Sequence, residues 1–223
     1  MVKKIYINPG HSDKDPGAVG YETERTLNVK TANYMNEYLL ANYDCQTKVT
    51  AGSVNSTATV AAEANSWGAD LLVSIHNNAG GGDGYEALVY SEKRKTLGQI
   101  FEKYVKEAGQ NSRGVKLRPD LGVLRLSNMP AVLNEGAFVD NQKDIADWNE
   151  EHELKKLGEA YAKAAAEFLG LEKKVVAPAP ESDNETIYRV QVGAYSKRTG
   201  AEKQLEELRA AGFGGIIVAS KKQ

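Results

Sequence analysis

Short apolar runs and amphipathic stretches alternate along most of the chain. Four apolar runs have the length and composition of strands, and they cover Lys4–Asn8, Leu71–His76, Tyr85–Tyr90 and Ala131–Glu135. The stretches between them carry apolar residues every three to four positions, which is the period of a helix packed on one side. Alternating strands and helices are typical of an α/β domain, so we predict a central, mostly parallel, twisted sheet flanked by helices.

The predicted helices of this domain each have one apolar face. They cover a segment from about Thr26 to Leu40, Val60–Trp67 behind the capping candidates Asn55 and Ser56, Leu97–Ala108, and Leu154–Phe168 with a stop at Gly170. Each helix has one face to bury, and the sheet is the surface that can receive it.

The regular pattern ends near residue 171. Residues 172–185 (EKKVVAPAPESDNE) combine charges with two prolines and lack apolar periodicity, which indicates a linker. Residues 186–223 then predict a small βαβ unit, with strands at 187–193 and 215–219 around a helix at 200–211. This unit is shorter than the roughly 40 residues at which single domains usually need outside help. We therefore predict a domain over 1–171, a linker over 172–185 and a unit over 186–223.

Composition and charge exclude some classes of partner. The chain has 223 residues, of which 41% are hydrophobic and 26% charged, and its formal net charge of −2 gives no electrostatic reason to expect nucleic acid. No run approaches the roughly 20 apolar residues that cross a bilayer, so no membrane partner is expected. The opening MVKKIYINPGH indicates a first strand rather than a signal peptide, so we expect a cytoplasmic protein until something releases it.

Histidine and carboxylate are the metal ligands that this sequence offers. Cys45 is the only cysteine, which excludes a four-thiolate site. Of the three histidines, His11 and His76 follow or end predicted strands, at the sheet edge where open α/β sheets bind ligands. His152 lies in a charged helix start (NEEHELKK) and is expected to be solvated.

A catalytic zinc site needs a third protein ligand and a base. Glu24 opens the first predicted helix, where the helix dipole favours a carboxylate, and Glu22 is a competitor that spacing does not exclude. Glu135 ends the run AVLNE at the edge expected for His76, and a carboxylate there can accept a proton from water while zinc polarises an amide carbonyl.

Several ordered blocks of this chain resemble the zinc-dependent N-acetylmuramoyl-L-alanine amidases of the amidase-3 type, which occur in autolysins and phage endolysins. The blocks are NPGHSDKDPGAVGYETERTLNVKTA, WGADLLVSIHNNAGGGDGYEALVY, SRGVK and VLRLSNMPAVLNEGAFVDN, and the resemblance extends from Val2 to Gly170. It implies Zn²⁺ on His11, Glu24 and His76, with Glu135 as the catalytic glutamate. It also implies that the substrate is peptidoglycan, cut between N-acetylmuramic acid and L-alanine.

Two features depart from the family pattern. Asn8 stands where the family commonly has Asp, which bears on the support of His11, and the segment VTAGSVNSTATVAAEAN lacks the arginines usual before the second block. The absence of these arginines bears on contacts with the substrate. Arg125 and Asn141 could contact substrate, although a structural role is at least as well supported by the sequence.

The C-terminal segment YRVQVGAYSKRTGAEKQLEELRAAGF resembles half of a SPOR domain, a peptidoglycan-binding module built from two βαβ units. With one unit present, either two chains pair their C-terminal units in a homodimer or a single unit binds weakly.

Two other functions remain open at this point. A zinc endopeptidase that cuts peptide stems would need the same metal chemistry, and a wall-binding protein with an inert metal site would need no base. The filled Glu135 position argues against the second. The resemblance leaves open whether the protein is a phage endolysin admitted to the wall by a holin or an autolysin released by cell lysis.

Overall fold

The computed structural model describes residues 2–54, 56–174, 193, 195–210 and 217. Contacts between Cα atoms divide the chain into two compact units, Met1–Val175 and Val176–Gln223. The first unit holds the predicted sheet and nearly all of the described residues.

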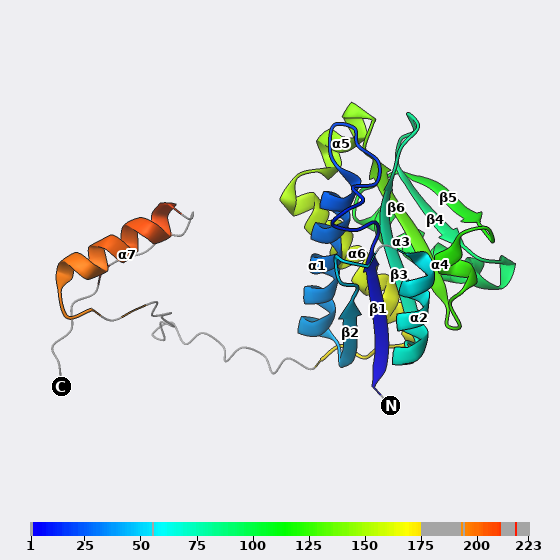
Figure 1. Ribbon diagram of the computed structural model, residues 1–223, viewed down its shortest axis with the longest axis horizontal. Helices are drawn as coiled ribbons and strands as arrows, with labels where there is room; N and C mark the ends of the chain where they lie inside the picture. Colours follow the sequence, from blue (N-terminus) through cyan, green and yellow to red (C-terminus); the bar gives the residue numbers. More distant parts are fainter. Residues whose placement is uncertain (1, 55, 175–192, 194, 211–216, 218–223) are drawn as a thin grey trace. The chain divides into compact units, whose positions relative to one another are not determined.

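Six strands form one sheet in the first unit (Figure 1). They are β1 (Lys3–Pro9), β2 (Cys45–Val49), β3 (Leu71–Asn78), β4 (Tyr85–Val89), β5 (Ser112–Leu117) and β6 (Ala131–Phe138), in the order β2-β1-β3-β6-β4-β5. Only the β4–β6 pair is antiparallel, and the other pairs are parallel. The predicted mostly parallel sheet is therefore confirmed.

The helices of the first unit include the four that periodicity predicts. They are α1 (Glu24–Asn42), α2 (Thr57–Trp67), α3 (Lys95–Glu107), α4 (Gly122–Arg125), α5 (Gln142–Trp148) and α6 (Glu151–Leu169), with a short 3₁₀ turn at Glu92–Arg94. Ser56 caps α2 as predicted, because its side chain accepts a hydrogen bond from the Thr59 N–H. Gly170 ends α6 in the left-handed conformation. The other capping candidate, Asn55, lies outside the described residues.

The two faces of the sheet bury separate apolar cores. On the face that α1, α3 and α6 cover, the buried strand residues include Ile5, Ile7, Leu71, Val73, Tyr85 and Val132. On the face that α2 and α4 cover, they include Tyr6, Leu72, Leu88, Ala131 and Leu133. Because successive residues of a strand point to opposite faces, strands with two covered faces read as continuous apolar runs. This is why β1, β3 and β6 were recognisable from sequence.

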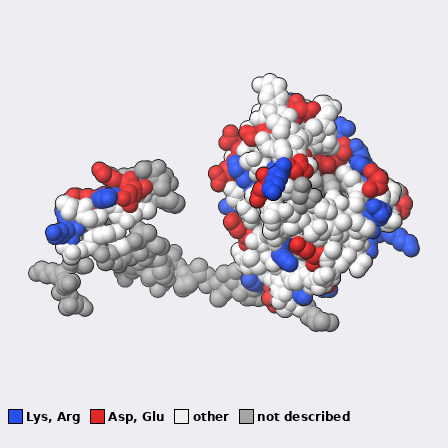
Figure 2. All heavy atoms as spheres, viewed as in Figure 1, with Lys and Arg blue, Asp and Glu red and all other residues white. Residues whose placement is uncertain are grey.

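None of the described helices is long and apolar enough to cross a membrane. On the face drawn in Figure 2, acidic and basic side chains are interspersed.

In the second unit, the structure describes one helix, α7 (Arg198–Ala210), which matches the helix predicted at 200–211. The Tyr195 hydroxyl donates to Gln204 Oε1 at 2.9 Å, and Arg198 pairs with Glu202 four residues on. Apart from residues 193 and 217, the strands predicted at 187–193 and 215–219 lie outside the described residues, as does most of the linker predicted at 172–185.

Candidate metal centre

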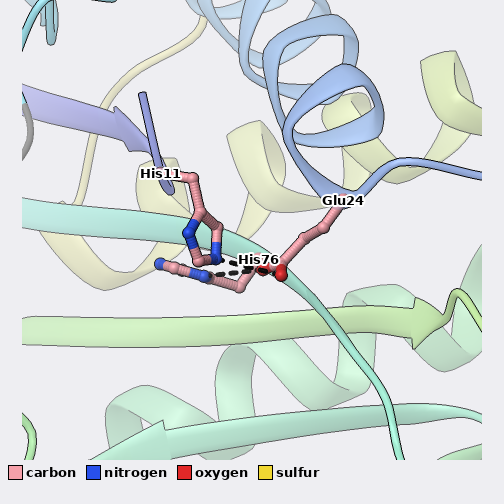
Figure 3. A group of neighbouring side chains, drawn as sticks. All are labelled: His11, Glu24 and His76. Atoms are coloured by element: carbon pink, nitrogen blue, oxygen red, sulfur yellow. Dashed lines mark hydrogen bonds and ion pairs between the residues drawn. The ribbon is translucent and has the colours of Figure 1, made fainter. Parts of the chain in front are cut away.

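His11, Glu24 and His76 converge where β1 and β3 end and α1 begins (Figure 3). Each offers one ligand atom, and these atoms all lie within 4.8 Å of one another. Glu24 bridges the two rings, with 2.9 Å from its Oε2 to His11 Nε2 and 2.9 Å from its Oε1 to His76 Nδ1. Glu22 is not part of this cluster, and His152 lies on the surface paired with Glu153. The structure thus brings together the three residues predicted as ligands.

His76 owes its position to the sheet. It belongs to β3, an interior strand between β1 and β6, and its register partner on β6 is Glu135. Its ring lies against the backbone of Gly10, where any side chain on residue 10 would overlap it. A glycine is therefore required at this close approach.

His11 is positioned by a turn. Its φ of 67° makes it the only non-glycine residue with positive φ in the described part of the chain. Histidine tolerates this left-handed conformation better than most residues. Its Nδ1 lies 3.0 Å from Asp15 Oδ2, which directs Nε2 towards Glu24. Sequence reasoning missed Asp15, and its spacing of four residues from His11 was the signal available.

Glu24 is the buried member of the cluster, with 4% of its surface exposed. The Ala18 N–H donates to its Oε2 at 2.9 Å and the Asn77 N–H donates to its Oε1 at 3.2 Å. Burial opposes ionisation of Glu24, yet its hydrogen bonds with His11 and His76 hold its pKa well below the usual range. The hydrogen bond with Glu24 raises the pKa of His11 to about 9 although burial opposes this.

Glu135 lies on β6 beside the cluster, opposite His76 on one side and Glu86 of β4 on the other. Its Oε2 is buried and has no hydrogen-bond partner among the described residues. Burial raises the pKa of this carboxyl to about 7. A buried, unpaired carboxylate oxygen is costly to keep in a folded protein, so this atom is suited to meet a ligand.

The glycine-rich loop after β3 is held by side chains that follow β6. Asp140 Oδ2 accepts hydrogen bonds from the Gly80 and Gly81 N–H groups at 2.7 and 2.9 Å. Asn141 donates to the Gly82 carbonyl at 2.7 Å and caps α5 through its Oδ1. This assigns Asn141 a structural role, the alternative that the sequence left open.

The Asn8 side chain is directed elsewhere than expected. Its Nδ2 donates to the hydroxyl of Ser74 at 2.9 Å, and both residues are buried. The carboxylate that supports His11 is Asp15. The departure at position 8 therefore concerns contact between β1 and β3.

Comparison with known proteins assigns the chain to a family. Residues 5–167 match the family model described as N-acetylmuramoyl-L-alanine amidase. The chain belongs to that amidase family. A second model, the SPOR domain, matches residues 158–219, which begins inside α6. Both resemblances predicted from sequence are confirmed. The first also confirms the predicted class of activity, because this amidase is a hydrolase of peptidoglycan.

Individual relatives of the amidase agree with this assignment. The chain is 30% identical over 223 residues to the N-acetylmuramoyl-L-alanine amidase CwlM of Bacillus licheniformis, covering 96% of this chain and 84% of that protein. It is 33% identical over 197 residues to the endolysin of Bacillus phage SPP1, covering 82% of this chain and 72% of the endolysin. The catalytic domain of the amidase CwlV from Bacillus (Paenibacillus) polymyxa var. colistinus superposes with a TM-score of 0.72 at 27% identity, covering 77% of this chain and all of that one.

Proposed function

We propose that this amidase cleaves the bond between N-acetylmuramic acid and L-alanine with a zinc ion held by His11, Glu24 and His76 and with Glu135 as the catalytic base. The observation that carries the proposal is the pairing of two features on neighbouring strands. A three-donor cluster lies at the end of β3, and an unpaired buried carboxylate oxygen lies opposite His76 on β6.

The donor set fits zinc. Catalytic zinc sites typically use three protein ligands from imidazole and carboxylate and leave one position open, and this cluster offers two imidazoles and one carboxylate. Asp15 supplies the hydrogen bond to a ligating imidazole that such sites usually have. Zinc in this position would supply Lewis acidity towards an amide carbonyl and would make water a better proton donor.

Glu135 performs the proton transfers in this mechanism. Its carboxylate accepts a proton from the attacking water as the water oxygen bonds to the lactyl carbonyl carbon. It then gives that proton to the amine of L-alanine as the C–N bond breaks, so it is regenerated. A pKa of about 7 suits both steps, because the group can accept and return a proton near neutral pH.

The test is product analysis on purified peptidoglycan with and without a chelator. New L-alanine amino termini, lost on chelation, are expected. Other amino termini would indicate a zinc endopeptidase, and zinc binding without any soluble product would indicate an inert wall-binding protein.

Two variants separate the roles of metal and base. Glu135→Gln should retain zinc and lose turnover by at least about 100-fold, whereas His76→Ala should lose both. His152→Ala, on the exposed start of α6, is the matched control and should behave as the parent. Turnover of Glu135→Gln within tenfold of the parent would remove Glu135 from the mechanism.

For the rest of the chain, we propose a catalytic domain over 1–171, a linker over 172–185 and a wall-binding unit over 186–223 that pairs with its copy in a homodimer. The SPOR match supports wall binding. Sedimentation of the full chain at increasing concentration tests the pairing, since a mass that stays at 24.2 kDa contradicts it.

We also propose that the protein meets its substrate only after a holin or cell lysis releases it from the producing cell. Its similarity to a phage endolysin supports this route. Appearance of the protein outside cells before any lysis would contradict it.

A further inference from the structure

A row of polar side chains crosses the sheet from the metal-binding cluster to the edge strand β5. His76, Glu135 and Glu86 are register partners on β3, β6 and β4. Strand alternation places Glu135 on the same face as Leu133, and Glu86 on the same face as Leu88, the face that α2 and α4 cover further along. The face thus changes from apolar to polar within one pleat, beside the proposed catalytic base.

Glu86 anchors two cations at the end of this row. Its side chain is 7% exposed, and it accepts hydrogen bonds from Arg113 Nε and Lys116 Nζ of β5, each at 2.5 Å. The side chains of Arg113 and Lys116 are 42% and 43% exposed. Burial opposes ionisation of Glu86, but the two cations hold its pKa below the usual value. One buried anion therefore fixes two partly exposed cations, and the group keeps a net positive charge.

Arg113 has a second restraint. Its guanidinium lies over the ring of Phe138 at 5.2 Å from the ring centre, while its Nε faces Glu86. An arginine held by its Nε and by one face of its plane can still present its two terminal nitrogens. This is the arrangement that binds a carboxylate with two parallel hydrogen bonds.

We propose that Arg113 and Lys116 bind a free carboxylate of the peptide stem of the substrate. The proposal rests on the function proposed above, because that mechanism sets the direction of the peptide. Glu135 must reach the departing amine, so the peptide leaves on the β6 side of the cluster. The polar row continues from Glu135 through Glu86 to the two cations on that same side.

Strand spacing indicates which carboxylate is bound. From β6 to β5 is two strand spacings, or about 10 Å, and an extended peptide covers about 3.3 Å per residue. The carboxylate bound by Arg113 and Lys116 is therefore carried by the second or third residue of the stem, counted from the L-alanine whose amine is released.

The experiment compares muramoyl tripeptides that differ in one group. One pair carries a carboxylate or a carboxamide on the second residue, and another pair differs in the same way on the third. The parent should hydrolyse the carboxylate member of one pair with a kcat/KM about tenfold higher. In Arg113→Gln and in Lys116→Gln, turnover of that member should fall about tenfold while turnover of its carboxamide partner changes less than twofold.

Lys93→Gln is the control, since Lys93 is an exposed cation of the 3₁₀ turn Glu92–Arg94, which follows β4. This variant should keep the parent's preference. Equal treatment of carboxylate and carboxamide by the parent in both pairs would overturn the proposal, as would variants that slow both members equally. Hydrolysis of the carboxamide substrates by the parent reports on the amidase function itself, so failure of the carboxylate site and failure of that function are distinguishable.

Discussion

The candidate metal centre has two sides that are built differently. On one side, His76 and Glu135 lie in adjacent interior strands, and the backbone ladder of β3 and β6 sets their spacing. On the other side, His11 and Glu24 bracket a segment that lacks long regular elements and is held by its own side chains, chiefly Asp15. A ladder position depends on many backbone hydrogen bonds, whereas a turn position depends on a few particular atoms. The turn side should therefore be the more sensitive to single substitutions.

The largest effect is expected at Gly17. Its φ is +70°, and an added Cβ would overlap Glu24 Oε2 and the ring of His11. Gly17→Ala should therefore lower zinc affinity and turnover by at least about 100-fold, since small misplacements of reacting groups are costly. Zinc titration and amidase assays measure both quantities.

Gly68→Ala is the control for Gly17→Ala. Gly68 has a nearly identical φ of +69°, but nothing lies within 4 Å of an added Cβ. Both variants should lose about 1 kcal/mol of unfolding free energy from backbone strain, and only Gly17→Ala should lose zinc. Equal zinc affinities in the two would contradict the importance of the turn.

A smaller effect is expected from Asp15, which orients His11. Asp15→Asn should weaken zinc binding by about 10- to 100-fold, because a neutral amide supports the imidazole less well. Asn8→Ala, which removes the bond to Ser74 between two strands, should leave zinc affinity within about threefold of the parent. The reverse order would show that the sheet side is the sensitive one.

The pH dependence of stability tests the side of the site that β3 and β6 form, through Glu135. The pKa of Glu135 is raised by burial to about 7 from 4.5. Its contribution to folding is therefore full below about pH 4.5 and is lost as pH rises through about 7. In chelator-treated protein, Glu135→Gln should be more stable than the parent above pH 7, by at most ~3 kcal/mol, and similar to it near pH 4. Urea unfolding at several pH values measures this, and parallel curves for the two proteins would contradict it.

The smallest effects are expected at Asn141 and Arg125. Asn141→Ala removes the cap of α5 and the bond to Gly82, and should cost about 1 kcal/mol of unfolding free energy. Arg125→Ala, at the exposed end of α4, should change that free energy by less than about 0.5 kcal/mol. Thermal melts of the two variants separate these outcomes.

What the sequence could predict followed from burial. Interior strands and the amphipathic helices α3 and α6 carry long apolar signals, so they were found. The helix α1 was found from the spacing of Leu27, Met35 and Leu39, although its buried face also carries Asn28 and Thr31. The strands β2 and β5 were missed because they lie at the two edges of the sheet and carry polar or charged residues, such as Lys48 and Arg113, and because Gly114 interrupts β5 at a φ of 89°. The helix α5 was missed because its seven residues are too few to show a period.

The residues of the candidate site also differ in whether the sequence could predict them. Histidines and carboxylates placed at element ends were identifiable from their positions along the chain. Asp15 was not, because it acts from within an irregular turn, and Glu86 was not, because it becomes a neighbour of Glu135 only through the pairing of β4 with β6. The neighbourhood of Glu86 and Glu135 joins residues far apart in sequence and leaves no local pattern, whereas the four-residue spacing of Asp15 from His11 was a local signal.

The single antiparallel pairing in the sheet has a chemical consequence. Because β4 runs against β6 and β5 follows β4, these two strands meet the rim of the active site with the residues that begin them. Were β4 reversed, its apolar end at Leu88 and Val89 would stand at that rim in place of Glu86. The direction of one strand thus determines whether the surface beside Glu135 is apolar or charged.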